Sequence, residues 1–120
     1  MKFTDSHEWV VLEGEQIARV GITTYAQKEL GDIVYVELPI VGKMVNAKQE
    51  VAVLESTKAA ADIYSPLSGV IEEVNAKLNT APELINQSAE ADGWIYKLRL
   101  SKREEINQLM EEDEYRAMLK

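Results

Sequence analysis

The chain has 120 residues, a formal net charge of −8 at pH 7 and no cysteine. That length predicts one domain, residues 1–120, with a hydrophobic core. The acidic charge argues against nucleic-acid binding, because phosphate contacts need clustered Lys and Arg. The lack of cysteine excludes disulfides, thiolate catalysis and Cys-ligated zinc. No apolar run is long enough to span a membrane, so we expect a cytoplasmic protein without a membrane partner.

The first third of the sequence predicts strands and one short helix. Apolar and alternating runs bounded by turn residues indicate the strands, and a Thr cap with a terminal Gly indicates the helix. The predicted elements are strands at 7–12 and 16–22 around Gly14, a helix at 25–30 after Thr23 or Thr24 and before Gly31, and a strand at 33–38 before Pro39.

The middle of the chain predicts a hairpin with a lysine at its tip. Two β-prone runs, 51–54 and 62–64, flank a short stretch of small and polar residues that contains Lys58. Three alanines follow this lysine, and no other lysine lies within nine residues of it. A single uncrowded amine on a hairpin suits covalent acylation, although a turn lysine is most often an ordinary solvated charge.

Two segments of the chain repeat each other faintly. Pro39-Ile-Val-Gly42 has the Pro-x-x-Gly spacing of Pro66-Leu-Ser-Gly69, and Asn46-Ala-Lys48 recurs as Asn75-Ala-Lys77. Turns reuse Pro, Gly and Asn, so chance explains the echo as well as symmetry does. The alternative is a sandwich with quasi-two-fold symmetry, whose halves each contribute one strand to the lysine hairpin.

The last third of the chain predicts two more strands and terminal helices. A strand at 70–74 precedes a helical turn near 82–86, a loop at 88–92 and a strand at 93–100. Ser101 to Glu104 matches a capping box, and apolar stripes predict C-terminal helices at about 102–119. The fold class expected is therefore mainly β, a flattened barrel or sandwich of two sheets with short peripheral helices.

Catalytic constellations are not evident in the sequence. His7 is the only histidine, and no nucleophile with a base and an orienting group accompanies it. We interpret His7 as a structural hydrogen-bonding residue and expect no enzyme activity from this chain alone.

The chain resembles the H-protein family of the glycine cleavage system. The resemblance rests on ordered motifs along nearly the whole sequence: Ser6-His-Glu-Trp-Val10, Val20-Gly-Ile-Thr23, Leu30-Gly-Asp32, Val36-Glu-Leu-Pro39, Glu55-Ser-Thr-Lys-Ala-Ala60, Asp62-Ile-Tyr-Ser-Pro66, Pro82-Glu-Leu-Ile-Asn86 and Gly93-Trp94. Lipoyl and biotinyl carrier domains of this kind have a quasi-two-fold barrel-sandwich fold, which agrees with the internal echo.

The resemblance implies a lipoyl carrier that works as a swinging arm. In that family lipoate forms an amide with the lysine that matches Lys58, inside a motif that here comprises Glu55, Ser56, Thr57 and Ala59. The arm carries the aminomethyl group of glycine from glycine decarboxylase (P-protein) to aminomethyltransferase (T-protein). Dihydrolipoyl dehydrogenase (L-protein) then reoxidises the lipoyl group of the arm. Lipoate-attaching enzymes install this group on the lysine.

The family also shelters the loaded arm in a surface cleft. The matching positions here are Ser6, Glu8, Ile22, Leu30 and Asp62. The two carboxylates suit a protonated amine, and the two apolar side chains suit an aliphatic arm. The alternative is that Ile22 and Leu30 are plain core residues and that Glu8 and Asp62 are plain surface acids.

The sequence departs from the family pattern at three places. Thr57 stands where Val is usual, Ala47-Lys48-Gln49 lacks a glycine, and the Ser88–Asp92 loop lacks the usual proline. Three other functions stay open: a lipoyl carrier for lipoate relay or another lipoate-dependent pathway, a biotin carrier, and an unmodified adaptor with an inert Lys58. A biotin carrier would be expected to have Met-Lys-Met at the tip.

Overall fold

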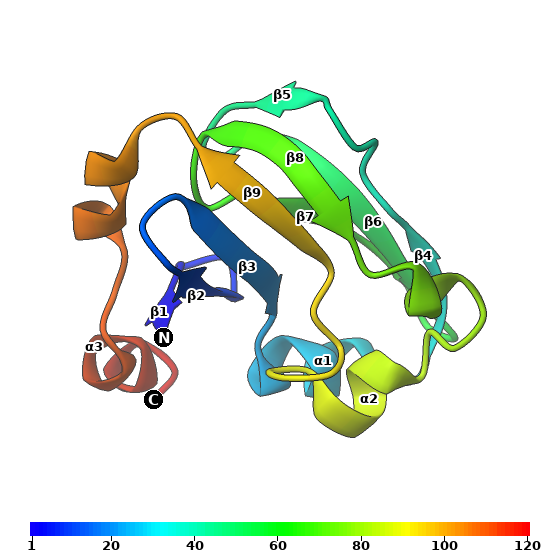
Figure 1. The fold of residues 1–120 in the computed structure, drawn as a ribbon. Coiled ribbons are helices and arrows are strands. Elements are labelled where there is room, and N and C mark those ends of the chain that lie inside the picture. The colour runs from blue at the N-terminus through cyan, green and yellow to red at the C-terminus, as the bar shows by residue number, and fades with distance from the viewer.

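The computed structural model describes residues 1–120, which form two antiparallel sheets with short helices at the periphery (Figure 1). The strands are β1 (Lys2–Phe3), β2 (Glu8–Glu13), β3 (Ile17–Ile22), β4 (Ile33–Glu37), β5 (Met44–Val45), β6 (Glu50–Ser56), β7 (Ala60–Tyr64), β8 (Gly69–Val74) and β9 (Tyr96–Leu100). The α-helices are α1 (Thr24–Leu30), α2 (Leu84–Ser88) and α3 (Glu112–Met118), and the 3₁₀ helices are η1 (Ala76–Asn79) and η2 (Arg103–Gln108).

The two sheets stack as a sandwich and do not close into a barrel. One has six strands in the order β1-β2-β3-β9-β8-β5, and the other has three in the order β4-β6-β7. The mainly β fold class is confirmed, and of the two architectures expected, a flattened barrel or a sandwich, the structure has the sandwich. In Figure 1 the short helices α1 and α2 lie together at one end, and α3 lies beside both chain termini.

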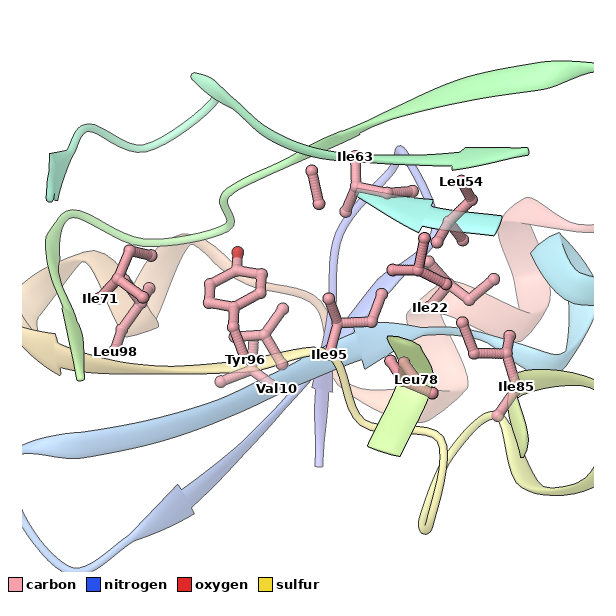
Figure 2. Packing of buried hydrophobic residues seen from close by; sticks show 14 of the residues in the cluster. Val10, Ile22, Leu54, Ile63, Ile71, Leu78, Ile85, Ile95, Tyr96 and Leu98 are labelled. Atoms are coloured by element: carbon pink, nitrogen blue, oxygen red, sulfur yellow. The ribbon is translucent and has the colours of Figure 1, made fainter. Parts of the chain in front are cut away.

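One hydrophobic core of 18 buried residues lies between the sheets. Leu54 and Ile63 of the three-stranded sheet face Ile22, Ile95 and Tyr96 (Figure 2). The alternation predicted for β3 is confirmed at Ala18 and Val20, which are fully buried. Such burial is the main stabilising contribution to the fold.

The internal echo corresponds to a structural pairing. The segment after Gly42 forms β5, and the segment that begins at Gly69 forms β8. These two strands pair antiparallel, with Met44 opposite Val70 and Val45 opposite Gly69. The two repeated segments therefore meet side by side, an arrangement that agrees with quasi-two-fold symmetry.

The predicted strand at 93–100 was too long at its start. β9 begins at Tyr96, and Ile95 is fully buried although alternation placed it on the opposite face from Tyr96. Gly93 lies in a close turn, where an added Cβ would stand 2.9 Å from backbone atoms of α2. Tertiary packing of this turn overrides the strand pattern.

The predicted capping box at Ser101 was also wrong. Residues 103–108 form a 3₁₀ helix without a side-chain cap, and the observed capping box joins Glu111 and Glu114 at the start of α3. The acidic run therefore starts a helix, and Glu111 also forms an ion pair with Lys2. None of the helices has the length and apolar character that crossing a membrane requires.

A second cluster joins the C-terminal helix to the N-terminus. Tyr115 of α3 stacks on Phe3, with ring centroids 4.7 Å apart. Its hydroxyl lies 2.7 Å from Oγ1 of Thr23, the N-cap of α1, and 2.8 Å from Nδ1 of His7. His7 has a φ of 73° and takes part in this hydrogen-bond chain, which agrees with a structural role.

Candidate functional site

The hairpin that carries Lys58 turns on the side chain of Ser56. Its hydroxyl oxygen accepts hydrogen bonds from the backbone N–H groups of Lys58 (3.1 Å) and Ala59 (3.0 Å). The N–H of Ser56 donates to the carbonyl of Ala59 at 2.8 Å and closes the turn. These bonds satisfy the backbone of a turn that has no glycine, so the lysine stands on an ordered support.

The tip of the hairpin is also fixed to the link between α1 and β4. The N–H of Thr57 donates to the carbonyl of Asp32 at 3.1 Å. Asn86 of α2 holds both sides of that link, because its Oδ1 accepts from the N–H of Ile33 and its Nδ2 donates to the carbonyl of Gly31, each at 2.8 Å. The support of the tip thus extends from α2 through this link to Thr57.

The Lys58 side chain is exposed and forms no ion pair. It lies close to Gly31, where an added Cβ would stand 3.0 Å from Cε of Lys58. The other motif residues differ in their positions. Thr57 and Ala59 are exposed in the turn, Ser56 is half-buried beneath it, and Glu55 is exposed on β6 opposite Ala60 of β7.

A second polar group lies at the start of β2, around the carboxylate of Glu8. This side chain is 2% exposed, and its Oε1 accepts hydrogen bonds from the hydroxyls of Thr4 and Ser6, each at 2.6 Å. Burial raises the pKa of Glu8 above its ordinary value, while the hydrogen bonds from Ser6, Thr4 and the backbone of Tyr64 oppose part of that rise. A buried carboxylate of this kind provides a hydrogen-bonding environment for a cation or an amine.

A cavity of about 240 Å³ opens beside Glu8. The N-terminal loop, the turn around Lys48, the end of β7 and the segment at and after η2 form its walls. Its lining residues are Phe3, Thr4, Asp5, Ser6, Glu8, Ala47, Lys48, Tyr64, Ser65, Pro66, Glu105, Gln108, Leu109 and Met110.

One face of β7 connects the hairpin tip with this cavity. Ala60, Asp62 and Tyr64 share that face because side chains alternate along a strand. Ala60 follows the turn, Asp62 is exposed half-way along, and Tyr64 lines the cavity. The strand rises about 3.3 Å per residue, so Ala60 and Tyr64 are about 13 Å apart.

The five residues expected to form the cleft are therefore not equivalent in the structure. Ser6 and Glu8 meet at the cavity, whereas Asp62 lies on the connecting face of β7. Ile22 pairs with Glu8 across β2 and β3 and is 1% exposed. Leu30 ends α1 next to Gly31 and packs partly buried against the core.

Sequence reasoning missed several residues that build this region. Asn86 lies within the predicted helical turn near 82–86 and in a motif that the family resemblance uses, but no sequence signal indicated that its side chain binds the link between α1 and β4. Glu105 accepts hydrogen bonds from the N–H (2.7 Å) and hydroxyl (2.9 Å) of Ser68, and so joins η2 to the loop after β7. No local pattern predicts such a contact between distant segments.

Comparison with known proteins identifies the family to which this chain belongs. A family model described as glycine cleavage H-protein matches residues 1–120. The chain belongs to the glycine cleavage H-protein family. A glycine cleavage system H protein of Thermotoga maritima is 53% identical over 114 residues, covering 95% of this chain and 91% of that protein. One from Stenotrophomonas maltophilia is 51% identical over 119 residues, covering 99% of this chain and 91% of that protein.

A solved structure agrees with the sequence comparisons. The crystal structure of a glycine cleavage system H protein from Mycobacterium marinum has a TM-score of 0.89 and 34% identity. The match covers 98% of this chain and 94% of the chain in that crystal structure. As a member of the H-protein family, the chain is a lipoyl carrier that works with the other components of glycine cleavage, and it is not itself an enzyme.

Proposed function

We propose that Lys58 carries the lipoyl group in an amide bond and that residues 1–120 act as one carrier domain for the aminomethyl group of glycine. The observation that carries the proposal is the exposed, unpaired Lys58 at the tip of a hydrogen-bonded hairpin. Its place in the Glu55–Ala59 motif of a glycine cleavage H-protein supports it.

The residues around Lys58 fit an acylated side chain. The amine is exposed, and the turn and the adjoining Gly31 leave it without bulky neighbours. Acylation forms a C–N bond from Nζ to the lipoyl carbonyl and breaks the carbonyl bond to the leaving group of an activated acyl phosphate. The amine releases its protons to solvent, so Lys58 loses its positive charge.

The lipoyl group, when bound, supplies a disulfide that accepts the aminomethyl group and is reduced in the same step. The protein chain determines where the lipoyl group is held. A lysine that is rigidly supported at its Cα but free beyond it raises the effective concentration of its load at each partner site. Ser56 and Thr57 fix the backbone of the hairpin tip by hydrogen bonds, and the side chain of Lys58 remains free to move.

We further propose that the face of β7 leads the arm to the cavity at Glu8. An extended lipoyl-lysine arm has roughly a dozen bonds of about 1.5 Å in a zigzag and reaches about 14 Å. That reach matches the length of β7 from Ala60, next to the tip, to Tyr64 at the cavity. In this arrangement Leu30 contacts the start of the arm, Asp62 its middle and Ser6 and Glu8 its end. Ile22, a buried core residue opposite Glu8 on β3, supports Glu8 from within the core.

The Glu8 carboxylate is suited to hold the loaded amine. It is already desolvated and oriented by two hydroxyls, so an ammonium or amine donor finds a charge-assisted acceptor without further reorganisation. Shielding from water would slow loss of the aminomethyl group. The partners that load, unload and reoxidise the arm are, in this proposal, the P-, T- and L-proteins.

The experiment is the intact mass of the protein purified from its native cells. We expect a lipoyl mass increment in the wild type and none in Lys58→Arg. Lys48→Arg is the matched control, because Lys48 is also an exposed turn lysine and lies at the other end of β6. This variant should retain the increment.

Two results would contradict the proposal. An unmodified native protein would make Lys58 an ordinary turn lysine, and an increment that persists in Lys58→Arg would place the arm elsewhere. For the cavity, loaded Glu8→Ala protein should lose methylamine faster than the loaded wild type, and an equal rate would exclude binding of the amine by Glu8.

A further inference from the structure

Exposed apolar side chains are concentrated in one part of the chain. Nine large hydrophobic residues are exposed, and five of them lie between Val34 and Met44. Single exposed apolar residues are ordinary, but adjacent ones indicate an interaction surface. Two members of this group, Val34 and Tyr35, are neighbours on β4 and are 54% and 53% exposed.

An irregularity in β4 turns both of these residues outward. Ile33 pairs with Ser56 of β6, but the next pair is Tyr35 with Glu55, so the register shifts at Val34. In a regular strand, adjacent side chains point to opposite faces. Here both Val34 and Tyr35 are exposed, and the core resumes with the buried Val36. Bulges of this kind re-aim side chains, often next to functional sites.

The bulge lies beside the lysine hairpin. Tyr35 pairs with Glu55, three residues before Lys58, and β4 is one of the two edge strands of its sheet. Neighbouring strands lie about 5 Å apart, so the Tyr35 backbone is one strand spacing from the hairpin. The Tyr35 hydroxyl has no hydrogen-bond partner within the protein.

We infer that Val34 and Tyr35 form the docking surface for the enzyme that acylates Lys58, an inference that rests on the proposed function. That enzyme meets the chain before any arm exists. Its active site must therefore close around Nζ of the lysine itself, within the reach of one side chain from the hairpin. Later partners meet an arm of about 14 Å and need not press on this surface.

The charges around the two residues specify the chemistry of the partner. Asp32, Glu37 and Glu55 are exposed next to Val34 and Tyr35 in sequence or register, and none of the three forms an ion pair. The surface is thus an apolar pair with an acidic rim. The acylating enzyme is expected to present an apolar depression rimmed by Lys or Arg, since complementary charges speed and orient association.

The test uses the unmodified full chain, a lipoate–protein ligase, lipoic acid and Mg·ATP. The ligase joins lipoate to AMP with release of pyrophosphate. Nζ of Lys58 then attacks the lipoyl carbonyl, the bond to AMP breaks, AMP leaves with the electron pair, and the displaced proton passes to solvent. The rate is followed by intact mass at increasing concentrations of the protein substrate.

The double variant Val34→Ser/Tyr35→Ser is compared with Val41→Ser/Met44→Ser. The control residues are equally apolar and even more exposed, at 56% and 73%, but Met44 pairs with β8 and not with the hairpin. We expect the first variant to raise KM for the protein substrate about tenfold with little change in kcat, as loss of an aromatic anchor does. The control variant should stay within about twofold of the wild type.

A second measurement separates docking from distortion of the hairpin. Acetylation of Lys58 by a small activated ester needs no docking surface and should proceed at the wild-type rate in both variants. A slowed small-reagent reaction would mean that the substitution had disturbed the tip, and the docking inference would then be wrong. An unchanged KM in Val34→Ser/Tyr35→Ser, or an equal rise in the control, would also overturn it.

The same experiment distinguishes this inference from the function on which it rests. If the ligase leaves the wild type unmodified, or modifies Lys58→Arg, the proposed function fails. If it modifies the wild type at Lys58 and acylates Val34→Ser/Tyr35→Ser with the same KM, the carrier function stands and only the docking surface is refuted.

Discussion

Gly31 ends α1 beside the side chain of Lys58, and Gly31→Ala tests how much its backbone conformation contributes to stability. This residue ends α1 with φ 83° and ψ −153°, a region that only glycine adopts readily. Forcing an alanine into it costs about 1–3 kcal/mol, and the lower backbone entropy of unfolded alanine offsets about 0.5 kcal/mol of that. We expect a net destabilisation of about 1–2 kcal/mol, which for a chain of this size lowers Tm by about 4–8 °C.

The assay is thermal unfolding, with Gly42→Ala as the control. Gly42 has φ 92° and nothing within 4 Å of an added Cβ, so it shares the backbone cost without a neighbour. At Gly31 the new Cβ meets only the end of the Lys58 side chain, Cε at 3.0 Å and Nζ at 3.7 Å, and this flexible end can rotate away. The two variants should therefore lose similar stability, and Lys58 should still be acylated by a small activated ester. An unchanged Tm in Gly31→Ala would refute the reasoning.

Two further variants should raise stability. Lys48 has φ 71° without being a glycine and forms no ion pair. Lys48→Gly relieves about 1 kcal/mol of left-handed strain, and the larger backbone entropy of unfolded glycine offsets about 0.5 kcal/mol of that gain. The net gain of about 0.5 kcal/mol should raise Tm by about 2 °C, whereas a lower Tm would contradict this. Glu8 has a pKa raised by burial, so its favourable contribution is present at low pH and is lost as pH rises through the folded-state pKa. Glu8→Gln should therefore raise Tm relative to the wild type at pH 7, with the gain shrinking towards pH 4, and a gain independent of pH would show that burial of the charge is not its cause.

The hairpin and most strands were predictable because their signals are local. Turn residues and short apolar runs located the Lys58 hairpin, and Thr23 with Gly31 bounded α1 as expected. These features depend on backbone preferences of a few neighbouring residues. The pairing of β5 with β8 was not predicted, because the repeat indicated two equivalent halves without indicating which of their strands would meet.

The cavity and the C-terminal segment were not predictable in the same way. Ser101 and Glu104 satisfy a capping pattern, yet tertiary contacts select a 3₁₀ helix there, and Glu105 from that helix binds Ser68 in a distant loop. The bulge at Val34 likewise depends on how β4 registers with β6. Each of these features is decided by packing between segments far apart in sequence, which local propensity does not encode.

The contact between β1 and the C-terminal segment has a consequence for the order of folding during synthesis. Phe3 exchanges backbone hydrogen bonds with Met110, and both residues line the cavity at Glu8. The lysine hairpin, by contrast, has its supports at Asp32 and Asn86 and uses no residue beyond α2. The acceptor lysine is thus completed early, whereas the cavity acquires its last wall only when the C-terminal residues dock. A nascent chain would therefore have a lysine ready for acylation before it has the cavity that protects the aminomethyl group.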